Sequence, residues 1–135
     1  MKQVVTLALV VLLALSVSAA KDNKAMSNKS HEMTGYLVDQ MCGKKMVMKD
    51  VKKSNAKAAR HTKDCAFQDM CKESGFGLVS GGKFYKFDEK GDKEAVEFLN
   101  NSKKENNFKV EVNGTMEGDK LAVSSITDYK VEKKK

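Results

Sequence analysis

The sequence predicts a mainly β fold of five strands with two helical insertions. Three observations predict it. Apolar and polar residues alternate in several short stretches, and glycines mark the turns between paired stretches. Residues 57–74, between the first and second strands, contain no Gly or Pro, and residues 92–99, between the third and fourth, place apolar residues on one face, so both segments are expected to be helical.

The first strand is expected at residues 33–39 (MTGYLVD), which are rich in strand formers. Residues 43–55 are rich in lysine, lack a strand pattern and are expected to form a loop or a short helix. Residues 57–74 contain no Gly or Pro and precede Gly75, a helix stop signal, so one helix is expected there. Together these segments form a helical excursion between strands one and two.

The second and third strands are expected at residues 76–79 and 83–87, as a hairpin around a Ser-Gly-Gly turn. Asp92 can then cap a helix that runs to about Leu99, with apolar residues on one face.

The last two strands are expected around residues 108–112, which alternate with period two, and residues 121–123. A turn at Gly118-Asp119 joins them as a second hairpin. Five strands with a helix between the third and fourth is the order of an OB-fold, a small, partly open barrel. We therefore expect one OB-like domain over residues 33–130.

The N-terminus predicts export. A lysine precedes an almost unbroken apolar run, and small residues follow it, which is the order of a secretory signal peptide over residues 1–20. Cleavage is expected after Ala19 or Ala20, which makes the protein secreted or periplasmic. Residues 21–32 are expected to be a flexible leader, and residues 131–135 a basic tail.

The formal net charge of the 135-residue chain is +7. A basic balance favours solubility and loose association with an anionic envelope surface. Nucleic acid is not an expected partner of an exported protein. The apolar run is shorter than the roughly 20 residues of a spanning helix, so no membrane span is expected after processing.

The candidate functional residues are Cys42, His61, Cys65 and Cys71, all between the end of the first strand and the second. On a single helix, His61 and Cys65 would share one face because they are four residues apart. Cys42 could add a third metal ligand, and Cys71 a fourth only if the helix bends. Zinc accepts such a set, and copper(I) prefers its sulfur atoms and the methionines that cluster nearby.

Two alternatives remain open for the same residues. In an oxidising compartment two of the three cysteines could form a disulfide. On one helix Cys65 and Cys71 would lie about 9 Å apart along the axis, beyond the reach of a disulfide, so Cys42 would pair with one of them. A thiolate beside His61 could instead act in redox or nucleophilic chemistry. No C-x-x-C spacing or orienting partner supports this, so no enzyme activity is expected.

Several segments resemble a group of small exported bacterial OB-like proteins. The resemblance rests on TGYLVDQMCG, on His61 with two following cysteines, on SGFGLVSGGKFYKF and on FKVEVNGTMEGDKLAVSSI, and it covers residues 33–128. It implies the fold and an exported location, and no particular activity. In that group the two later cysteines are closer together than Cys65 and Cys71.

The sequence thus predicts an exported envelope protein that binds a metal ion or a small ligand at the Cys/His residues. The alternative is a structural or interaction module whose cysteines form a stabilising disulfide.

Overall fold

The computed structural model describes residues 29–131. The predicted signal peptide, most of the leader and most of the basic tail lie outside the described residues. In chain order the elements are β1 (His31–Asp39), α1 (Gln40–Met46), α2 (Val51–Ala59), α3 (Lys63–Ala66), α4 (Asp69–Glu73), β2 (Phe76–Ser80), β3 (Lys83–Phe87), α5 (Glu89–Asn101), β4 (Lys109–Glu117) and β5 (Lys120–Asp128).

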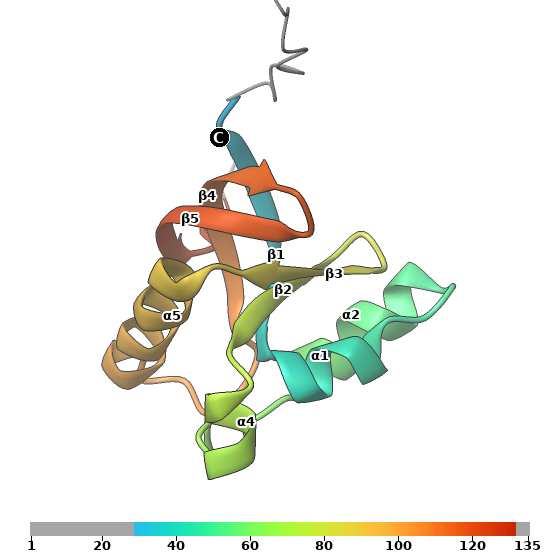
Figure 1. Cartoon of the computed structure of the whole chain (residues 1–135). Helices are drawn as coiled ribbons and strands as arrows, with labels where there is room; N and C mark the ends of the chain where they lie inside the picture. Colours follow the sequence, from blue (N-terminus) through green and yellow to red (C-terminus); the bar gives the residue numbers. More distant parts are fainter. Residues whose placement is uncertain (1–28, 132–135) are drawn as a thin grey trace, which may run out of the picture.

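The five strands form one sheet that closes into a ring in the order β1-β2-β3-β5-β4 (Figure 1). All neighbours are antiparallel except β3 and β5, which meet through a short parallel contact. Strand β1 closes the ring because its first half pairs with β4 and its second half with β2. Where it changes partner, Gly35 lets the strands approach: a Cβ there would lie 2.4 Å from the carbonyl oxygen of Val79.

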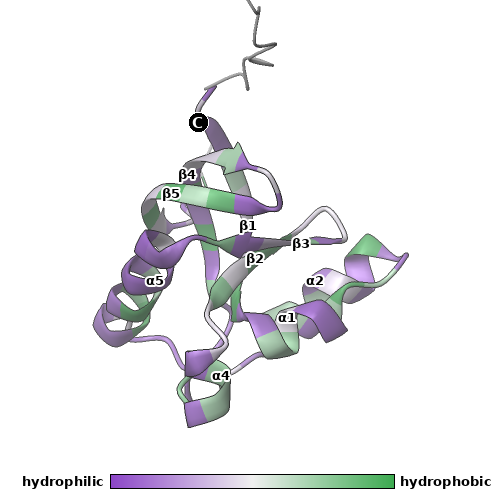
Figure 2. Ribbon diagram, viewed as in Figure 1, coloured by the Kyte–Doolittle hydropathy of each residue, from purple (hydrophilic) through white to green (hydrophobic). Residues whose placement is uncertain are grey.

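Two apolar clusters stabilise this arrangement. The larger one includes Leu37, Leu78 and Val110 of the ring together with Ala95 and Leu99 of α5. Accordingly, helix α5 is apolar on one side and hydrophilic on the other (Figure 2).

The smaller cluster consists of Val38, Met46, Ala58 and Val79 and joins helices α1 and α2 to the other face of β1 and β2. Figure 1 shows these two helices on the opposite flank from α5. The ends of β1 and β2 nearest to these helices are therefore covered on both faces.

The helical excursion between β1 and β2 is confirmed, but the single helix expected over residues 57–74 is wrong. The chain forms the end of α2 and then two short helices. Helix α3 begins after Thr62, whose side chain accepts a hydrogen bond from the amide of Cys65. It ends at Ala66, which is buried in the larger cluster with Phe67 packed against it, and Gln68 is extended before α4. Burial of these apolar residues thus breaks the helix without Gly or Pro.

The helix between the third and fourth strands is also confirmed, but its cap is Asp88 and not Asp92. The carboxylate of Asp88 accepts hydrogen bonds from the amides of Gly91 (2.8 Å) and Val123 (3.1 Å). Asp92 lies within the first turn and accepts a bond from the amide of Phe76 at 2.7 Å. The helix therefore starts earlier than expected, because Asp88 caps it and also accepts a hydrogen bond from the amide of Val123 on strand β5.

Both hairpins are confirmed, and the last two strands are longer than the alternation indicated. Strand β1 begins at His31, two residues inside the expected leader. Among the described residues, no helix combines the length and apolar character needed to cross a membrane.

Candidate metal centre

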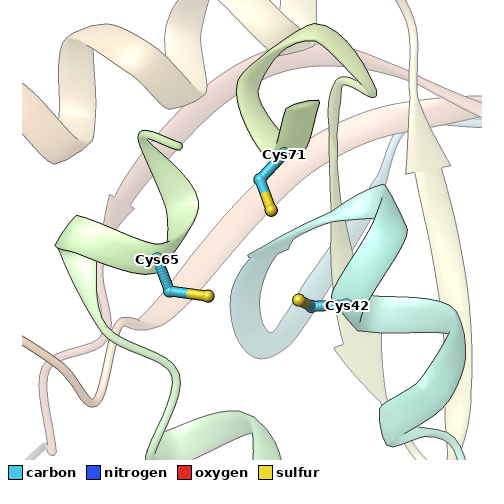
Figure 3. A group of neighbouring side chains, drawn as sticks. All are labelled: Cys42, Cys65 and Cys71. Carbon is cyan, nitrogen blue, oxygen red and sulfur yellow. The ribbon is translucent and has the colours of Figure 1, made fainter. Parts of the chain in front are cut away.

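Three short helices bring the three cysteines together. Cys42 lies on α1, Cys65 on α3 and Cys71 on α4, and their side chains point toward one another (Figure 3). The three sulfur atoms all lie within 4.8 Å of one another. Cys71 is buried, whereas Cys42 and Cys65 are partly exposed. The cluster thus has a buried inner side and an accessible outer side.

Each cysteine occupies the third position of its helix. The residues that precede these helices are Asp39, Thr62 and Gln68, each three residues before a cysteine. Helical side chains point back toward the N-terminus of their helix, so the first turns of the three helices converge on the sulfur cluster. This placement explains how cysteines 23 and six positions apart in sequence can meet.

Asp39 fixes the position of Cys42. It is the last residue of β1, is fully buried, and accepts a hydrogen bond from the amide of Cys42 at 2.9 Å. The amide of Gln40 donates to the carbonyl oxygen of Gly75 at 2.8 Å. Because α1 has only seven residues, these tertiary contacts, rather than helix propensity, hold it in place.

Ser74 links the helices of Cys42 and Cys71. Its hydroxyl accepts a hydrogen bond from the amide of Met41 (3.2 Å) and donates to the carbonyl oxygen of Cys71 (2.7 Å). The side chain of Ser74 therefore ties the first turn of α1 to the end of α4, beside the backbone bond between Gln40 and Gly75.

His61 lies between α2 and α3 and faces Asp39. Its Nε2 atom is 2.8 Å from Oδ2 of Asp39, with the two side chains 3% and 0% exposed. The two side chains are thus in direct contact as a buried pair, with an angle that is poor for a hydrogen bond, while the other ring nitrogen of His61, Nδ1, has no hydrogen-bond partner. Such unpaired buried groups are costly and rare in proteins.

All four predicted site residues gather in this region, but in two groups that share Cys42. One group is the three cysteines; the other is Asp39, Cys42 and His61, whose ligand atoms also lie within 4.8 Å of one another. The expected pairing of His61 and Cys65 on one helix face is wrong, because α2 ends before His61 and α3 begins after it. Cys71 joins the cluster because the expected helix is broken.

Asp39 was missed from the sequence. The signal that could have found it is an acidic residue at the junction of a strand and a helix, three residues before a cysteine.

Burial and nearby carboxylate charge control the acidity of the cluster. Burial, followed by the charge of Asp39 and the proximity of Cys65, raises the pKa of Cys42 to about 12. Burial and Asp39 also raise the pKa of Cys71. Burial by itself would raise the pKa of Asp39, but His61 and the amide of Cys42 outweigh it and lower that pKa. Without a metal ion, Cys42 and Cys71 are therefore protonated at neutral pH.

The cysteines are free in the structure, so the disulfide considered as an alternative is not formed here. The nearby methionines do not behave as one group. Met46 fills the smaller apolar cluster, whereas Met48 and Met70 are exposed. The sulfur ligands at the centre of this site are thus those of the cysteines.

Among the described residues, several surface grooves lie away from the cysteines. One of about 570 Å³ between α4 and α5 is lined by Lys72, Phe76, Asp92, Lys93, Val96, Glu97, Asn100 and Asn101. Its mixed charges do not select one class of ligand. The cysteine cluster, by contrast, gathers three free thiols that could hold one metal ion.

Comparison with known proteins does not assign a family. No family model matches the chain, and no significant match was found among curated proteins or solved structures. The resemblance to small exported OB-like proteins therefore stays a prediction.

Proposed function

We propose that this protein is an exported metal-binding protein whose site is the cluster of Cys42, Cys65 and Cys71, flanked by Asp39 and His61. The observation that carries the proposal is three free thiols within 4.8 Å of one another. Thiolates and imidazole are the ligands that zinc and copper prefer. The role is binding rather than catalysis.

Two finer points belong to this proposal. The ring order and the parallel contact between β3 and β5 support an OB-like barrel, in which α5 lies between strands three and four. The signal-like segment over residues 1–20 supports export, with the mature chain starting at Ala20 or Lys21. The mass of the processed protein from the medium or envelope tests the second point.

Native mass spectrometry of the mature protein, isolated without reductant or chelator, tests metal binding. We expect a mass increase of one zinc or copper ion, lost when Cys65 and Cys71 are replaced by Ala. His31→Ala is the matched control, because His31 is an exposed histidine at the start of β1. A mass lower by the two hydrogens of a disulfide, with no metal, would overturn the proposal in favour of a structural module.

A further inference from the structure

The two groups that share Cys42 offer an ion different chemistry. The three cysteines offer only sulfur, whereas Asp39, Cys42 and His61 offer one oxygen, one sulfur and one nitrogen. Neither Asp39 nor His61 joins both Cys65 and Cys71 within the 4.8 Å that unites the sulfur atoms. An ion at the centre of the three sulfurs would gain a fourth ligand only if Asp39 or His61 moved from its present position.

Given the metal site proposed above, we propose that its ion is copper(I), held by the three sulfur atoms alone, with Asp39 and His61 outside the coordination sphere. An ion about 2.3 Å from each of three sulfurs, the usual metal–thiolate length for zinc, needs sulfurs about 4 Å apart. The sulfurs lie within 4.8 Å of one another, so small side-chain movements would bring them to this spacing.

The donor set discriminates between the two candidate metals. Copper(I) is a soft ion and prefers thiolate sulfur. Structural zinc sites are almost always tetrahedral with four protein ligands, so three sulfurs leave zinc incomplete. Zinc would instead favour the mixed group, where Asp39, Cys42 and His61 would leave one position open to water. Binding of copper(I) displaces the thiol protons to solvent and changes no oxidation state.

The burial of the three cysteines is compatible with a metal ion that can be transferred to another ligand. Cys71 is 5% exposed and forms the inner wall, while Cys42 and Cys65 are partly exposed. An incoming thiol ligand could reach the ion from the side of these two cysteines. Asp39 acts as a positioning residue, because it holds the backbone of Cys42 at 2.9 Å from its carboxylate.

The test uses the full mature chain, reduced and kept without oxygen. Copper(I) affinity is measured by competition with a coloured copper(I) chelator, and X-ray absorption of the loaded wild-type protein reports its ligands. We expect three sulfur ligands and no nitrogen. Cys65→Ala should weaken copper(I) by more than about a hundredfold, and His61→Ala by less than about tenfold, the lower end for residues outside the coordination sphere.

A nitrogen ligand in the spectrum, or an equal loss in His61→Ala and Cys65→Ala, would overturn the all-sulfur site while the proposed metal function stands. Preference for zinc over copper(I) would do the same. If the reduced wild-type protein binds neither ion, both proposals fail. Because the absorption spectrum is taken on the wild type, the test does not depend on whether a variant folds.

Discussion

Removing the hydroxyl of Ser74 should loosen the cysteine cluster. In Ser74→Ala the amide of Met41 loses its acceptor, and the carbonyl oxygen of Cys71 loses the hydroxyl donor but keeps the amide of Ser74 at 3.2 Å. A hydrogen bond of this kind contributes about 1 kcal/mol net, and an unsatisfied buried group costs about 1–3 kcal/mol. Since Ser74 is only half-buried, water can replace part of both bonds, and we expect a loss of about 1–2 kcal/mol in the free energy of unfolding.

The same change should weaken metal binding, because α1 and α4 would no longer hold Cys42 and Cys71 at a fixed spacing. If binding must first order the site, each 1.4 kcal/mol of that free-energy cost lowers the affinity tenfold. We therefore expect copper(I) affinity to fall by about five- to thirtyfold, measured by chelator competition alongside urea unfolding of the metal-free protein.

Ser80→Ala is the matched control for this experiment. Ser80 is also half-buried and donates a 2.7 Å hydrogen bond, to the carbonyl oxygen of Thr34, but it lies on the ring away from the cysteines. It should cost a similar free energy of unfolding and leave metal affinity unchanged. If both variants lose affinity equally, or Ser74→Ala loses stability alone, Ser74 does not set the geometry of the site.

Three further predictions concern the helix cap at Asp88, the thiols of the cluster and the carboxyl group of Asp92. Asp88→Ala should destabilise the protein by about 1–2 kcal/mol in urea unfolding, and Asp88→Asn by clearly less, because Asn can still cap α5; equal losses would contradict this role. Metal affinity should rise between pH 6 and 8, since the raised pKa values of Cys42 and Cys71 mean that an ion must displace their protons; a flat profile in chelator competition would exclude thiolate ligands. Burial, opposed by the amide of Phe76, raises the pKa of Asp92, so the folded state favours its protonated form and loses that contribution as the pH rises through this pKa. Asp92→Asn should therefore be more stable than wild type at pH 7, with a gap that shrinks below about pH 4.

The strands could be predicted because their signals are local. Residues 108–112 alternate strictly with one face in the core, and the glycines at 81 and 82 have positive φ values that a tight turn requires. The ends of strands were harder to place. His31 belongs to β1 only because Gly114 lies opposite it on β4, a contact between residues far apart in sequence.

The helix breaks could not be predicted because no local residue marks them. Phe67 and Gln68 are compatible with a helix, and the break follows from packing Ala66 and Phe67 against the larger cluster. That error also made the expected spacing between Cys65 and Cys71 wrong. On one helix they would lie about 9 Å apart, whereas the broken chain places their sulfur atoms within 4.8 Å.

The cysteine spacing therefore has to be interpreted helix by helix. A C-x-x-C pair puts two ligands on one turn. Here each cysteine comes from its own helix and is the third residue of that helix. The shared feature is the distance from Asp39, Thr62 and Gln68 to the cysteine that follows, which is three residues in every case. Two of these residues accept a hydrogen bond from the amide of their cysteine, so the cap that starts the helix also orients the thiol. Capping residues three positions before cysteines are thus the pattern by which such a site could be found in sequences that lack the usual metal-binding spacing.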